Sequence, residues 1–103
     1  MANFMVLYPA KSEEIRWIER KEGVIVLNPV TGKYTKLNET ASYVWQISNG
    51  INRIDEIIKK ITCRYNITVD KVKKDLLHIM GDFKKLGIIV LYRKPNKFYH
   101  SFK

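Results

Sequence analysis

One segment, residues 32–45, constrains the fold more than any other part of the chain. Residues 33–37 have the alternation of a short strand, and a helical pattern begins at Glu39. Asn38 lies between them, and Asn is a preferred helix N-cap because its side-chain oxygen accepts a hydrogen bond from a free helix N–H. Glu39 adds negative charge where the helix dipole favours it. The segment therefore predicts a strand that passes directly into a helix, a corner suited to capturing an extended peptide.

The remaining chain alternates apolar residues at strand spacing and then at helix spacing. The pattern predicts strands at residues 15–19, 24–27, 33–37 and 88–92. It predicts helices at 39–48, 53–65 and 69–86, with Asn52 and Thr68 as N-caps of the second and third. This order indicates an α+β, winged helix-turn-helix-like fold, in which an N-terminal three-stranded antiparallel sheet precedes three helices and a C-terminal strand.

We expect residues 15–92 to form one domain, because 103 residues suffice for one core and not for two. Residues 1–14 are predicted to be an N-terminal extension, and residues 93–103 a basic aromatic tail. The N-terminus lacks the basic start and cleavage site of a signal peptide. Cys63 is the single cysteine, so no internal disulfide can form. Together with the lack of a long apolar run, this favours a cytoplasmic protein.

The chain offers little for catalysis. His78 is predicted on the polar side of the third helix and His100 in the tail, and neither has the neighbouring ligands that a zinc site needs. Cys63 has no nearby histidine, and no glycine-rich phosphate loop is present. We therefore expect no enzymatic activity, no metal and no cofactor. The formal net charge of +9 instead favours acidic or polyanionic partners.

The third predicted strand is the first candidate binding element. Its residues alternate between two faces, and as a sheet edge it would offer free backbone groups to a guest strand. Lysine also protects sheet edges from unwanted pairing, which is the structural alternative for the two lysines here. The candidate residues are Lys33, Tyr34, Thr35, Lys36 and Leu37.

One shoulder of the third helix is the second candidate. At 100° per residue, an apolar and basic group lies on one side of the core stripe, and Asp75 and Asp82 lie on the other. Leu77 and Met80, the apolar residues of this shoulder, are additional to the apolar stripe that the core needs. They therefore either form a groove wall or pack against the first helix or the wing. The candidate residues are Lys73, Leu77, Met80 and Lys84.

These motifs resemble the PqqD-like family. The run Glu22-Gly-Val-Ile-Val-Leu-Asn-Pro-Val-Thr-Gly-Lys-Tyr-Thr-Lys-Leu-Asn-Glu-Thr-Ala41 looks like its signature. Further matches follow at Trp45, Asn49-Gly50, Ile54-Asp-Glu-Ile57, Val72, Asp75, Phe83, Leu86 and Gly87-Ile88. The resemblance covers about residues 15–92. The N-terminal run from Asn3 to Tyr8 and the tail beyond Pro95 lie outside it.

The resemblance implies a non-catalytic, cytosolic peptide-binding chaperone, a recognition element of ribosomally made peptide natural products. Such proteins bind the leader of a precursor peptide as a strand antiparallel to the third strand, against the third helix. They present it to a modifying enzyme, namely a radical SAM protein, a leader peptidase or a cyclase. The implied site combines residues 33–37 with the shoulder around Leu77 and Met80.

Two alternatives remain open. The fold outline and the positive charge would suit a DNA-binding winged helix, but residues 68–86 contain no Arg, Asn or Gln to read base edges. Asp70 and Asp75 would also repel phosphates. The other alternative is an adaptor that docks only on an enzyme through exposed aromatic residues. The peptide, the product, the enzyme and the oligomeric state are not specified by these patterns.

Overall fold

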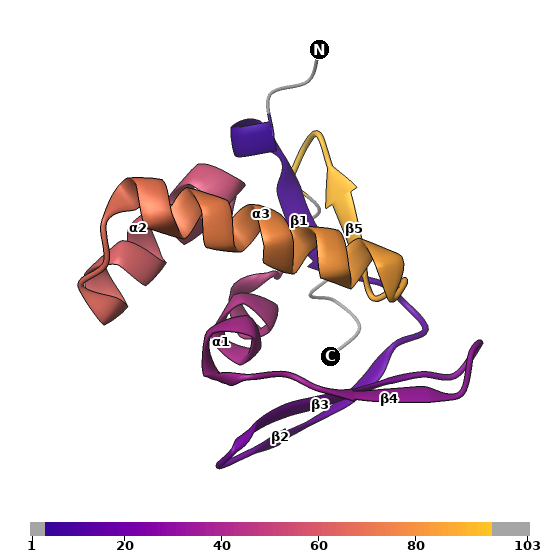
Figure 1. Ribbon diagram of the computed structural model, residues 1–103. Coiled ribbons are helices and arrows are strands. Elements are labelled where there is room, and N and C mark those ends of the chain that lie inside the picture. The colour runs from indigo at the N-terminus through magenta and orange to yellow at the C-terminus, as the bar shows by residue number, and fades with distance from the viewer. Residues whose placement is uncertain (1–3, 96–103) are drawn as a thin grey trace.

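Two antiparallel sheets and three helices make up the fold of the computed structural model, which describes residues 4–95 (Figure 1). A single turn of 3₁₀-helix, η1, precedes the first strand. The elements in chain order are η1 (Phe4–Val6), β1 (Tyr8–Lys11), β2 (Arg16–Arg20), β3 (Gly23–Asn28), β4 (Lys33–Lys36), α1 (Glu39–Ile47), α2 (Ile54–Tyr65), α3 (Val69–Lys85) and β5 (Ile89–Tyr92). The predicted tail lies largely outside the described residues.

The larger sheet has the order β2-β3-β4, so β3 is central and β4 is an edge. Antiparallel pairing places Ile18 opposite Ile25 and Thr35 opposite Val26. The turn between β3 and β4 closes with a bond from the Gly32 N–H to the Asn28 carbonyl, 2.8 Å. The predicted hairpin sheet is present, with strand ends within one residue of those expected.

The smaller sheet was not predicted. It pairs β1 with β5 in antiparallel register, and Ala10 at its centre is fully buried. Backbone bonds also join the Gly50 N–H to Pro9 and the Ile54 N–H to Leu7. Part of the expected N-terminal extension is thus built into the fold, and the C-terminal strand pairs with it rather than with the hairpin. A four-residue strand containing proline shows too little alternation to be recognised in sequence.

The helices follow their predicted spans closely, but one cap differs. Asn38 accepts a hydrogen bond from the Ala41 N–H at 2.8 Å, so the predicted cap of α1 is confirmed. Arg53, not Asn52, is the N-cap residue of α2. The Arg53 N–H donates to the Glu56 side chain at 2.8 Å, while the Asn52 side chain donates back to the Ile47 carbonyl. Asn52 therefore stabilises the end of the preceding helix.

Trp45 is the centre of the core and is fully buried, as its helical spacing predicted. Its ring meets Trp17 and Phe83 edge-on, with centroids 5.6 and 5.8 Å away. These contacts link β2, α1 and α3, and edge-to-face pairs add stability beyond area burial. The core thus holds α3 at a set position above the hairpin sheet. No helix within residues 4–95 has the length and hydropathy needed to cross a bilayer.

Candidate functional site

The free edge of β4 is the first component of the site. Leu37 donates its backbone N–H to the Val24 carbonyl at 2.8 Å, so its polar groups face β3. Backbone groups alternate in direction along an antiparallel strand, so Thr35 also faces β3. Tyr34 and Lys36 consequently direct their N–H and C=O groups toward the open side. Within the described residues, no strand pairs with that side of β4.

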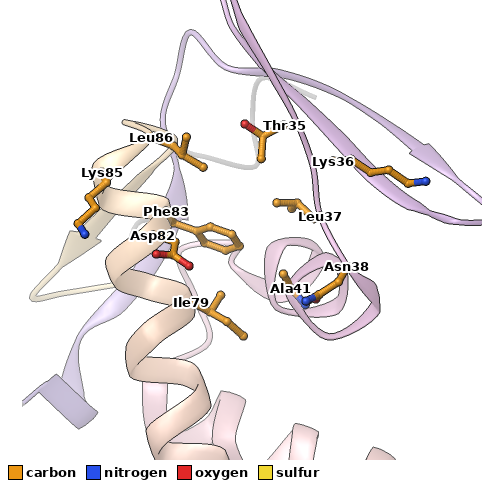
Figure 2. Close-up of a pocket in the computed structure, with 10 residues that line it drawn as sticks. All are labelled: Thr35, Lys36, Leu37, Asn38, Ala41, Ile79, Asp82, Phe83, Lys85 and Leu86. Carbon is orange, nitrogen blue, oxygen red and sulfur yellow. The ribbon is translucent and has the colours of Figure 1, made fainter.

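A cleft of about 400 Å³ lies between this edge and α3 (Figure 2). We call it the β4–α3 cleft. Leu37, just after β4, and Ile79 and Phe83, both on α3, converge on it, and Leu86 points into it from the end of α3. The residues that line it are Thr35, Lys36, Leu37, Asn38, Ala41, Ile79, Asp82, Phe83, Lys85 and Leu86. Its wall is mainly apolar, with charged groups at the rim.

A smaller depression of about 70 Å³ extends the cleft along β4. It shares Thr35, Lys85 and Leu86 with the main cleft and continues to Lys33 and Asn28. The two hollows together follow β4 from its last residue to its first. This elongated shape matches an extended chain better than a compact small molecule.

Ser42 holds one end of the cleft in place. Its buried hydroxyl accepts the Val24 N–H at 2.8 Å and donates to the Leu37 carbonyl at 3.1 Å. Gly23 lies against the same groups: a Cβ there would come within 2.6 Å of the Leu37 carbonyl oxygen and 2.9 Å of the Ser42 hydroxyl. The backbone φ of Gly23 is +135°, which non-glycine residues rarely adopt. Together these contacts join β3, the end of β4 and α1.

Asn28 holds the other end. Its side-chain amide donates to the Leu86 carbonyl at 2.9 Å, across 58 positions of sequence, and its oxygen accepts the Val30 N–H at 3.0 Å. One side chain therefore both shapes the hairpin turn and attaches it to the end of α3. Asn28 thus ties the hairpin to the end of α3, while Ser42 at the opposite end ties the end of β4 to α1.

The β4 residues predicted for the site lie at the cleft, with one exception. Thr35, Lys36 and Leu37 line the main cleft, and Lys33 lines the smaller depression. The Tyr34 side chain is 73% exposed and lines a different hollow, with Ile18 and Leu27 on the opposite face of the sheet. Only the backbone of Tyr34 is available to the open edge.

The structure does not bring the predicted α3 residues to this cleft. Lys73, Leu77, Met80 and Lys84 are absent from the cleft, whose α3 wall is formed by Ile79, Asp82, Phe83, Lys85 and Leu86. Met80 is 2% exposed and belongs to the core, which was the alternative reading, and Leu77 is 57% exposed outside the cleft. Helix periodicity identifies faces but not the neighbour of each face. Ile79 and Leu86 are half-buried and lie on the acidic side of the core stripe. Their apolar character on that side was the sequence signal for the wall that faces β4.

The rim of the cleft carries both signs of charge. The Asp82 carboxylate lies beside Ile79 and Phe83, while Lys36 and Lys85 extend away from the apolar floor (Figure 2). No ion pair engages Asp82 in the part of the chain that the structure describes. It is thus available to a cation or N–H donor on a ligand. Among residues 4–95, no group of three His, Cys, Asp or Glu side chains is arranged to hold a metal ion.

Comparisons with known proteins agree with this architecture. The family model for coenzyme PQQ synthesis protein D (PqqD) matches residues 23–89. A solved structure described as lasso peptide synthetase B1 complexed with the leader peptide is 19% identical, with a TM-score of 0.67 over 81% of this chain and 98% of that chain. TbiB1 in complex with the TbiA(beta) leader peptide is 22% identical, with a TM-score of 0.72 over 78% and 93%. No curated protein matches in sequence.

Proposed function

Because the chain belongs to the PqqD family, whose model spans most of it, we propose that it binds the leader of a ribosomally made precursor peptide. The peptide adds to the hairpin sheet as a strand along β4, within the β4–α3 cleft. The observation that carries this proposal is the open β4 edge beside an apolar cleft that runs along it. Two solved structures of similar fold are complexes with leader peptides, which supports the same use of the fold.

The cleft offers enough binding energy for a specific complex. Tyr34 and Lys36 each present one donor and one acceptor, and each backbone hydrogen bond contributes about 1 kcal/mol net. Apolar side chains of the peptide that reach Leu37, Ile79 and Phe83 add about 25 cal/mol per Å² of buried apolar surface. After the cost of ordering the peptide, a dissociation constant of about micromolar to nanomolar is expected.

The geometry also defines the chemistry of the peptide. Side chains of an added strand alternate in direction, so every second residue faces α3. Those residues should be apolar, because the α3 wall is formed largely by Ile79, Phe83 and Leu86. Asp82 favours a basic or N–H-donating neighbour, and Lys85 at the rim favours an acidic residue where the peptide leaves the cleft.

The protein itself is non-catalytic in this proposal. It acts in the cytoplasm and presents the bound leader to a modifying enzyme, such as a radical SAM protein, a leader peptidase or a cyclase. Binding one strand of the leader leaves the rest of the precursor free for chemistry elsewhere. The elongated cleft, open along β4, suits a chain that must extend beyond its binding site.

The test needs a cognate precursor, which is sought among short reading frames that neighbour the gene of this chain. Its leader, as a synthetic peptide, is titrated into the isotope-labelled full chain. We expect the largest amide shifts at Tyr34 and Lys36 and at the α3 residues Ile79 and Phe83, with new protection of the two β4 amides from exchange. Binding that leaves β4 unshifted and moves other surfaces would contradict strand addition along this edge.

A further inference from the structure

The hairpin sheet has a second apolar face, directed away from the helices. Residues paired across antiparallel strands share a face, so Ile18 lies beside Ile25 and Leu27 beside Tyr34. The opposite face supplies Val24 and Val26 to the core. We define the outer face as Arg16, Ile18, Arg20, Ile25, Leu27, Tyr34 and Lys36.

This outer face is unusual for a sheet that already covers a core on its other side. Antiparallel sheets of that kind normally present polar residues to water. Here Ile18 is 56% and Tyr34 73% exposed, and a shallow hollow of about 550 Å³ extends over Arg16, Ile25 and Leu27. A contiguous exposed apolar surface bordered by polar residues is typical of an interaction site.

The charges on the outer face select the kind of partner. Its three charged residues, Arg16, Arg20 and Lys36, are all basic, and none of its members is acidic. A second copy of the chain, with a formal net charge of +9, would bring like charges together. The complementary partner is a protein with an apolar patch bordered by carboxylates.

The outer face also adjoins the cleft through one strand. Tyr34 and Lys36 extend their side chains onto the outer face, while their backbone groups point along the open edge. A peptide paired with that edge would lie about 5 Å from β4. A partner seated on the outer face would therefore be adjacent to the bound peptide without covering the α3 side of the cleft.

We propose that the outer face of the hairpin sheet is the docking surface for the enzyme that modifies the bound peptide, through an apolar patch with an acidic border on that enzyme. The assignment rests on the proposed function. The peptide and the enzyme then use different surfaces of the same strand, so both can be bound at once. Docking here brings the enzyme to the peptide with no movement of α3.

The experiment compares two charge insertions at exposed apolar positions. Ile18→Asp places a carboxylate at the exposed isoleucine of the outer face, and Val69→Asp alters a position of similar exposure at the start of α3. The probe is a purified candidate modifying enzyme (a radical SAM protein, leader peptidase or cyclase) sought among the neighbouring genes, together with the synthetic leader. We expect Ile18→Asp to weaken enzyme binding by about tenfold or more, since an exposed apolar contact is lost and a carboxylate is brought against the acidic border of the partner. Leader affinity should be unchanged, and Val69→Asp should alter neither.

The other outcomes distinguish failure of the docking assignment from failure of the proposed function. Equal enzyme binding by wild type and Ile18→Asp, or no enzyme binding by a wild-type chain that binds the leader, overturns the docking assignment. Failure of the wild-type chain to bind the leader instead overturns the proposed function. Sedimentation of the wild-type chain as a dimer that Ile18→Asp dissociates would assign the face to a second copy and would also overturn the assignment.

Discussion

At the scale of single residues, Ser42 shows how one hydroxyl connects three elements. It satisfies the backbone of both Val24 and Leu37 from the first turns of α1, and it is 6% exposed. Ser is a weak helix former, so its position here is explained by these two bonds rather than by propensity. Gly23 serves the same junction, because any larger residue would collide with the Leu37 carbonyl.

Ser42→Ala should destabilise the fold. The change leaves a buried N–H and a buried carbonyl without this partner, and each such group costs about 1–3 kcal/mol. Urea unfolding should show a lower midpoint by an amount corresponding to about 2 kcal/mol or more. Gln46→Ala, at an exposed position of the same helix, is the control and should unfold at the wild-type midpoint. Matching midpoints for both variants would show that the junction contributes little.

A paired substitution on α3 tests which side of the helix faces the peptide. Ile79→Asp places a carboxylate in the apolar wall of the cleft, whereas Leu77→Asp places it on the exposed side. Calorimetry should show that Ile79→Asp lowers the affinity for the leader by about tenfold or more, because an unpaired charge would be partly desolvated. Leu77→Asp should bind as wild type. The reverse result would restore the shoulder predicted from sequence.

At the scale of elements, the direction of the β4 backbone decides what a substitution does. Proline removes one N–H, and the effect depends on which side that N–H faces. The Lys36 N–H faces the open edge, whereas the Thr35 N–H belongs to the ladder with Val26. Two neighbouring positions on one strand therefore separate binding from stability.

Lys36→Pro should weaken leader binding by about fivefold or more, because one backbone donor is lost. It should leave the unfolding midpoint nearly unchanged, because edge strands tolerate proline where its nitrogen faces outward. Thr35→Pro should instead destabilise the fold by about 1–3 kcal/mol, because a ladder bond is lost and the facing carbonyl is left unsatisfied. Lys36→Ala, which keeps the N–H, separates loss of the backbone donor from loss of the side chain. Calorimetry and urea unfolding measure the two effects. Normal affinity in Lys36→Pro would argue against pairing at this residue.

At the scale of the whole molecule, the fold depends on its N-terminal strand. Pro9 and Ala10 are buried, and β1 joins β5 to the loop between α1 and α2. Deleting residues 1–11 should cost about 3 kcal/mol or more, since a sheet and two further backbone bonds are lost. A fall in melting temperature would show this, and Ala10→Asp, which keeps the chain length but buries a charge, should act in the same direction. An unchanged melting temperature would mean that residues 1–14 are a separate extension.

The net charge of +9 belongs to the molecule rather than to any one site. It should speed association with an acidic leader, and salt should reduce the association rate more than it increases the dissociation rate. Stopped-flow measurements across a salt series test this directly. Duplex DNA serves as the comparison ligand: steeply salt-dependent DNA binding without leader binding would favour the DNA-binding alternative.

Local patterns were sufficient for much of the fold. Signals within a few residues of each other predict the Asn38 cap of α1, the hairpin strands, the three helices and the burial of Trp45. These signals are short-range: a helix cap and a periodic apolar pattern each involve residues that are close together in sequence. The strand-to-helix corner, and the β4 wall of the cleft, could therefore be predicted from sequence alone.

Only the tertiary structure determines the α3 side of the cleft and the pairing of β1 with β5. Which side of α3 faces β4 depends on how Phe83 meets Trp45 in the core, and the bond from Asn28 to the Leu86 carbonyl joins residues distant in sequence. The pairing of β1 with β5 is equally remote along the chain. Periodicity specifies that a face is apolar, but only packing determines what covers that face. Local sequence therefore specifies β4 and α3 separately, and contacts between residues distant in sequence place these two elements side by side.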